Sequence, residues 1–182
     1  MNRQEDYNPG PADMAHVEKD GDNWTLVLVK ELRHSPEKVW DALIDPEQLR
    51  EWAPFDADKS LGTVGATVKL TTVGAPAEYA SQTTVTRADA PNLLEYKWGE
   101  HDTRWELEAV GQGTRLTLWT KIDRPYIAMG AAGWHVCFDV LEGMLDGDPI
   151  GRTVGPDVMR FEGWQRLHKE YAQQFGVKGP QE

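Results

Sequence analysis

Six short segments in which apolar and polar residues alternate follow one another along the middle of the chain, and this feature restricts the fold most. Clusters of turn-forming residues, such as 74–76 and 111–113, separate the segments. Because short turns join antiparallel neighbours, the pattern predicts an antiparallel meander with one dry and one wet face. The predicted strands are residues 55–59, 67–73, 78–87, 93–98, 103–110 and 114–122.

Helical segments flank this meander. The apolar strand 24–33 stops at Ser35-Pro36, a capping residue followed by proline, which predicts that a helix begins there. Asp45-Pro46 is a second signal of this kind and opens a short helix. Beyond the meander we predict a long amphipathic helix and a final helix that Gly176 caps. Their apolar stripes are Trp134, Cys137, Phe138, Leu141, Met144 and Leu145, then Phe161, Trp164, Leu167, Tyr171 and Phe175.

Size and charge narrow the class of protein. A chain of 182 residues, 40% of them hydrophobic, suits one domain that buries its core without a disulfide or a structural metal. The net charge of −11 opposes contact with nucleic acid and anionic lipid. The sequence contains no apolar run that suits a signal peptide or a membrane-spanning helix, and Cys137 is the single cysteine. We therefore expect a cytoplasmic protein without membrane insertion.

Familiar catalytic motifs do not occur. The sequence lacks phosphate-binding glycine loops, the metal-binding patterns HExxH and CxxC, and the nucleophile pattern GxSxG. His135 and Cys137 project to different faces of the long helix, so they are interpreted as a surface histidine beside a core thiol. The sequence thus assigns no catalytic residue, and we expect neither a metal nor a cofactor.

Three polar groups could carry chemistry, although each has a simpler interpretation. His101-Asp102 lies in a hairpin turn, where a catalytic dyad would need a nucleophile that the sequence does not supply. His168 is typical of a partly buried histidine with one paired nitrogen, and ligand contact is the alternative. Glu106 and Glu108 share one face of a strand, and their alternation with apolar neighbours predicts that both are solvated.

Tryptophan is the most informative residue type. Eight Trp stand against four Phe, and each Trp brings a large apolar body with one N–H donor. The alternation directs several aromatic residues between the sheet and the long helix, where they form either a dense core or the wall of a cavity. We predict a ligand-sized cavity, because a strongly curved sheet around one helix leaves room. The converging residues are Tyr79, Trp98, Trp105, Leu118, Thr120, Trp134 and Phe138.

The order of these elements resembles a known family. The segments SPEKVWDALIDPEQLREW, WELEAVGQGTRLTL and GWHVCFDVLEGMLDG look like the Aha-type family, homologues of the activator of heat-shock-protein ATPase, in the START-like SRPBCC superfamily. The resemblance implies an α+β helix-grip fold: a curved antiparallel sheet around a long helix, with two short helices after strand one. It implies cavity contact for Trp98, Trp105, Leu118, Trp134, Phe138 and Leu141, and the C-terminal helix looks like an addition to the family pattern.

These observations define the expected organisation and function. Residues 1–22 are predicted to form a flexible arm, 23–176 a single START-like domain with its core at 24–147 and a helical extension at 157–176, and 177–182 a frayed tail. The favoured function is binding of a small hydrophobic ligand such as a lipid, polyketide or aromatic metabolite. The alternatives are a polyketide cyclase or dehydratase-like enzyme and a domain that contacts a chaperone ATPase. The final helix could cover a cavity mouth, pack outside the sheet or reach a second subunit in a homodimer.

Overall fold

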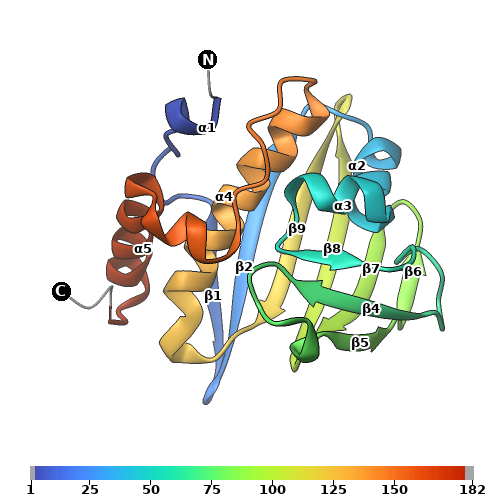
Figure 1. The fold of residues 1–182 in the computed structure, drawn as a ribbon, viewed down its shortest axis with the longest axis horizontal. Coiled ribbons are helices and arrows are strands. Elements are labelled where there is room, and N and C mark those ends of the chain that lie inside the picture. The colour runs from blue at the N-terminus through green and yellow to red at the C-terminus, as the bar shows by residue number, and fades with distance from the viewer. Residues whose placement is uncertain (1–2, 179–182) are drawn as a thin grey trace.

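The main sheet has six antiparallel strands that curve around one long helix (Figure 1). The computed structural model describes residues 3–178, so residues 1, 2 and 179–182 of the predicted arm and tail lie outside the described residues. The strand order is β1-β2-β9-β8-β7-β6. These strands are β1 (Ala15–Asp20), β2 (Asn23–Leu32), β6 (Arg87–Asp89), β7 (Leu93–Trp98), β8 (His101–Val110) and β9 (Gly113–Lys121).

A smaller sheet makes the meander less regular than the sequence predicts. It contains β3 (Phe55–Ala57), β4 (Thr67–Thr72) and β5 (Ser81–Thr84), in that order. The single strand predicted at 78–87 is wrong, because a 3₁₀ turn, η1 (Ala77–Tyr79), precedes β5 and the chain then changes sheets. At this corner the Val85 N–H donates to Ala66 O beside β4, whereas the Thr86 N–H donates to Glu95 O on β7.

The two short helices begin where the sequence places them. In α2 (Pro36–Ile44) the Ser35 hydroxyl accepts a hydrogen bond from the Lys38 N–H at 3.3 Å. In α3 (Pro46–Trp52) the Asp45 carboxylate accepts one from the Glu47 N–H at 3.0 Å. Both caps satisfy N–H groups that a helix start leaves unpaired, which confirms the two cap-and-proline predictions.

The long helix α4 (Ile127–Leu145) lies between the sheet and the final helix α5 (Glu162–Phe175), as Figure 1 shows. The 3₁₀ turns η2 (Arg124–Tyr126) and η3 (Gly155–Arg160) precede α4 and α5. Gly176 ends α5 in the left-handed region at φ 69°, so the predicted cap is confirmed. The α+β helix-grip prediction is also confirmed. Helix α5 packs against the side of α4 that faces away from the sheet. No helix among residues 3–178 has both the length and the apolar character needed to cross a bilayer.

The N-terminal segment differs from the expected loose arm. A short helix α1 (Arg3–Asp6) comes first, and β1 then pairs with β2 along its whole length, from Ala15 opposite Leu28 to Asp20 opposite Asn23. Only Ala15 of β1 is fully buried, because an edge strand contacts the core with few of its side chains. Its polar composition therefore concealed the strand in the sequence.

Candidate ligand-binding pocket

Aromatic side chains from the sheet and α4 form a cluster in the core. The Trp105 ring lies 5.5 Å from Trp134 and 5.9 Å from Phe138 between ring centroids, and its indole N–H donates to the Tyr96 hydroxyl at 3.1 Å. Leu118 and Leu141 are fully buried beside this cluster. This part of the space between sheet and helix is a packed core.

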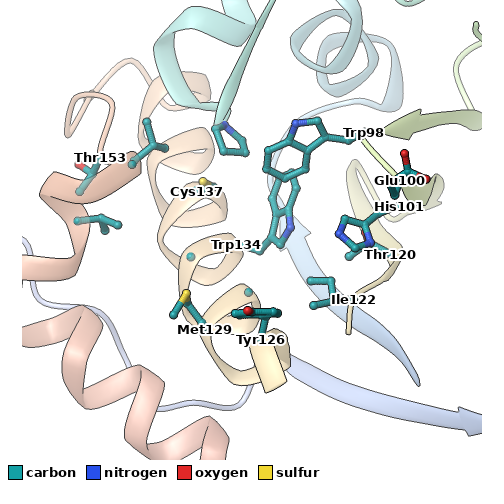
Figure 2. A pocket seen from close by; sticks show the side chains of 17 residues that line it. Trp98, Glu100, His101, Thr120, Ile122, Tyr126, Met129, Trp134, Cys137 and Thr153 are labelled. Carbon is teal, nitrogen blue, oxygen red and sulfur yellow. The ribbon is translucent and has the colours of Figure 1, made fainter. Parts of the chain in front are cut away.

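A cavity of about 530 Å³ adjoins the aromatic cluster. The β7–β8 hairpin, the end of β9, α4 and the segment 153–158 surround it. In Figure 2 the Trp98 and Trp134 rings lie next to each other, and Thr120 and His101 lie on the sheet side. The lining residues are Pro54, Trp98, Gly99, Glu100, His101, Thr120, Ile122, Tyr126, Met129, Gly130, Gly133, Trp134, Cys137, Thr153, Val154, Gly155 and Val158.

The predicted site residues fall into three groups. Trp98, Thr120 and Trp134 line the cavity. Tyr79 does not, because it lies in the η1 turn with 71% of its surface exposed, so its placement in the cavity is wrong. The remaining four belong to the packed core and are absent from the cavity wall: Trp105, Leu118, Phe138 and Leu141.

Two glycines on α4 help to explain why space remains there. Gly130 and Gly133 both line the cavity, one helical turn apart. A Cβ atom at Gly133 would meet no atom within 4 Å, whereas one at Gly130 would lie 2.6 Å from Ile122 Cδ1. The pair was visible in the sequence as glycine within a helical segment, which usually has a packing or functional reason.

The segment after α4 supplies another wall that the sequence analysis missed. Arg152 donates hydrogen bonds to Ala53 O at 2.8 Å, Phe55 O at 3.0 Å and the Asp56 carboxylate at 2.8 Å. These bonds hold the following residues, among them Thr153 and Val154, against the cavity. No local pattern reveals this arrangement, because the partners lie almost a hundred positions earlier in the chain.

The acid–base character of the wall is limited. Burial raises the pKa of the Cys137 thiol to about 12, so this cysteine stays protonated at neutral pH and is a poor nucleophile. Glu100 and His101 line the cavity on the β7–β8 hairpin, and Glu100 is exposed. The described residues contain no group of three or more side chains that could hold a metal ion.

Comparison with known proteins assigns the chain to a family. Residues 33–146 match the family model described as activator of Hsp90 ATPase homolog 1-like protein. The chain belongs to this family. The match covers more than half of the sequence and confirms the resemblance drawn from its motifs. No curated protein matches the chain.

Solved structures support the same fold for this Hsp90-activator-homolog-like chain. A conserved protein of unknown function, EF2215 from Enterococcus faecalis, is 13% identical with a TM-score of 0.69, over 88% of this chain and 89% of that one. CalU16 from Micromonospora echinospora is 18% identical with a TM-score of 0.60, over 90% and 92%. DynU16, from the dynemicin biosynthetic locus, is 20% identical with a TM-score of 0.62, over 75% and 52%.

Part of the cavity wall lies beyond the region that matches the Hsp90-activator-homolog-like family. The family model ends at residue 146, whereas four lining residues follow it: Thr153, Val154, Gly155 and Val158. Sequence outside the matched core therefore shapes this cavity.

The side of α4 that faces away from the sheet is also buried, which the sequence did not predict. His135, interpreted as a surface residue, is 2% exposed and its Nδ1 lies 2.7 Å from the Tyr171 hydroxyl of α5. Asp139 accepts a hydrogen bond from the Tyr7 hydroxyl and pairs with Lys30 at 3.3 Å. The surface interpretation of His135 is wrong because α5 and the N-terminal segment cover this face.

The other polar predictions have mixed outcomes. The Glu106 and Glu108 side chains are 45% and 63% exposed, which confirms that both are solvated. His168 is buried, as expected of its place on α5, but its Nδ1 has no hydrogen-bond partner among the described residues. Its burial lowers its pKa.

Proposed function

We propose that the protein binds a small hydrophobic molecule in the cavity between the sheet and α4. The observation that carries the proposal is the cavity itself, whose volume of about 530 Å³ falls within the range of roughly 300–1,000 Å³ that is typical of small-molecule sites. Its wall is largely apolar and aromatic, with few polar groups. A ligand would gain about 25 cal/mol for each Å² of apolar surface that leaves water, before the costs of association.

A neutral environment-sensitive dye, Nile red, tests this proposal. Its fluorescence should rise when it enters the apolar cavity of the wild-type protein. The variant Gly133→Leu extends a side chain from α4 into the cavity, at a position where the new Cβ meets no atom within 4 Å, and should weaken binding by at least about tenfold. Equal dye binding by the two folded proteins, or none by either, would contradict the proposal. Native mass spectrometry would identify a co-purified ligand directly.

A cyclase or dehydratase-like enzyme is the second candidate, and one observation favours it. His101 lines the cavity beside Glu100, so an imidazole is within reach of a bound molecule and could transfer a proton. The test is hydrogen–deuterium exchange at the carbon next to the carbonyl of a bound ketone, followed by NMR in deuterated water. Faster exchange with the wild type, and its loss in His101→Gln, would support catalysis. Exchange at the uncatalysed rate would contradict catalysis and would leave ligand binding as the proposed function.

A further inference from the structure

Four tryptophans in or beside the aromatic cluster, Trp52, Trp98, Trp105 and Trp134, have indole N–H groups that are not equivalent. Trp52 donates to Ala42 O at 3.0 Å, Trp98 to the Thr72 hydroxyl at 3.1 Å, and Trp105 to the Tyr96 hydroxyl at 3.1 Å. Trp134 is only 4% exposed, yet its N–H has no hydrogen-bond partner among residues 3–178. Of these four rings, Trp98 and Trp134 line the cavity, and Trp134 alone keeps its donor unused within the described part of the chain.

Thr120 presents a similar group from the sheet. It is 2% exposed, lines the cavity, and its hydroxyl also has no hydrogen-bond partner within the described chain. Two other buried threonines of the sheet differ, since Thr114 donates to His34 O at 2.7 Å and Thr103, which pairs with Thr120 across the strands, donates to His101 O at 3.4 Å.

The fully buried side-chain atoms without a partner in the described residues are Trp164 Nε1 and His168 Nδ1, away from the cavity. Trp134 Nε1 and the Thr120 hydroxyl therefore remain accessible from it. Unpaired polar groups that are accessible from an apolar cavity indicate where a ligand bonds.

We infer that the cavity is built for a flat, neutral, apolar molecule that carries a hydrogen-bond acceptor such as a ring ketone, with Trp134 Nε1–H as the donor to it. This inference rests on the proposed binding function and adds the chemical class of the ligand. The Thr120 hydroxyl is the second polar contact, and it can donate or accept.

Charge favours a neutral acceptor over an acid. None of the 17 residues that line the cavity is Lys or Arg, and Glu100 is the carboxylate among them. A carboxylate group, such as that of a fatty acid, would lose its water, meet no lysine or arginine, and be repelled by Glu100. A carbonyl group needs only a donor, and Trp134 supplies one.

The arrangement of the two rings favours a flat molecule over an extended chain. The ring centroids of Trp98 and Trp134 are 5.8 Å apart, and their planes make an angle of 81°. A planar ligand can stack on the Trp98 ring while the edge that carries its acceptor lies in the plane of the Trp134 ring, the direction in which the indole N–H points. A flexible alkyl chain gains nothing from this corner beyond the burial of its surface.

Three probes of nearly equal size test the inference: 2-ethylnaphthalene, 2-acetylnaphthalene and 2-naphthoate, each titrated by calorimetry. Without a donor in the cavity the ketone would bind less tightly than the hydrocarbon, because its carbonyl loses hydrogen bonds to water. We expect the ketone to bind wild type at least as tightly as the hydrocarbon. We expect the carboxylate to bind at least about tenfold more weakly than the ketone.

Two variants then remove one polar group each: Thr120→Val keeps the side chain's shape, whereas Trp134→Phe keeps an aromatic ring of smaller size. Trp134→Phe should weaken ketone binding relative to hydrocarbon binding by about tenfold, the factor expected for one buried hydrogen bond, and Thr120→Val should change the ratio less. Trp119→Phe, which removes an indole on the opposite face of the sheet, should leave the ratio unchanged and serves as the control. The ratio is measured within each variant, so a change that merely loosens the fold affects both probes.

Separate outcomes overturn the two proposals. A ketone-to-hydrocarbon ratio that is the same in wild type, Trp134→Phe and Thr120→Val, or tighter binding of 2-naphthoate than of the ketone, would overturn the inference while binding itself stands. Failure of all three probes to bind the wild type would instead count against the proposed function.

Discussion

Both sides of α4 are buried, but the polar side chains on the two sides differ in whether they have a partner within the protein. On the side toward α5, His135 and Asp139 are paired with Tyr171, Lys30 and Tyr7. On the cavity side, the Trp134 indole is left without a partner among the described residues. Paired groups stabilise the packing of α5 and the N-terminal segment, whereas the unpaired one is available to a ligand. Burial alone therefore does not distinguish structural from functional positions on this helix.

Removal of Asp139 should have the largest effect on stability. Its carboxylate joins Tyr7 and Lys30, and its loss leaves a largely buried ammonium with Glu142, at 3.6 Å, as its remaining carboxylate partner. Asp139→Ala should lower the free energy of unfolding by about 3 kcal/mol, measured by urea denaturation. Asp102→Ala, which removes an exposed partner of Lys121, should cost about 0.5 kcal/mol or less and is the matched control. If the two variants lost the same free energy of unfolding, the contacts of Asp139 with Tyr7 and Lys30 would not have the stabilising role proposed for them.

Arg152→Ala should have the next largest effect, this time on the cavity side. The variant removes three hydrogen bonds that attach the segment after α4 to Ala53, Phe55 and Asp56. We expect a loss of about 2 kcal/mol in the free energy of unfolding and faster amide exchange at Thr153 and Val154. Exchange rates unchanged from the wild type would show that this wall holds its position without Arg152.

Substitution of two glycines of α4, Gly133 beside the cavity and Gly143 near the C-terminal end, should have smaller and opposite effects on stability. Gly133→Ala should stabilise the protein by about 1 kcal/mol, because alanine favours a helix and the new Cβ meets no atom within 4 Å. Gly143→Ala on the same helix should destabilise it, since the Cβ would lie 2.9 Å from the Asp148 backbone oxygen. Thermal melting of both variants checks the prediction. If both substitutions stabilised the protein, the backbone at Asp148 would move away from the new Cβ at little cost, which would contradict the predicted difference.

The smallest expected effect is a dependence on pH from the α5 side. Burial lowers the pKa of His135 below its ordinary value of 6.5, although the nearby Asp139 opposes this shift. The unfolded chain therefore binds a proton at a higher pH than the folded protein, and the free energy of unfolding should fall as pH falls below 6.5. The decrease should end once pH is below the folded-state pKa of His135.

Two variants assign this dependence to its source. His135→Gln should make the slope of stability against pH shallower in this range. Burial also lowers the pKa of His168, so His168→Gln measures the separate contribution of that histidine. A slope that neither substitution changes would contradict the assignment to these two buried rings.

Much of the fold could be predicted because its signals are local. Ser35 and Asp45 cap helices whichever protein surrounds them, and the alternation in β7, β8 and β9 already separated buried from solvated faces, Glu106 and Glu108 included. The site was harder to predict. Trp98, Thr120 and Trp134 line the cavity, but the same alternation could not distinguish them from Trp105, which belongs to the packed core.

By itself, the sequence determined most of the strands and helices and which faces of the sheet are apolar, since periodicity and capping act over a few neighbouring residues. Only the tertiary structure decided that β1 completes the sheet, that α5 buries His135, and that space remains beside Trp134. A cavity is the volume that side chains from distant segments fail to fill. Its existence depends on the distances between β7, α4 and the segment held by Arg152, and no local pattern records those distances.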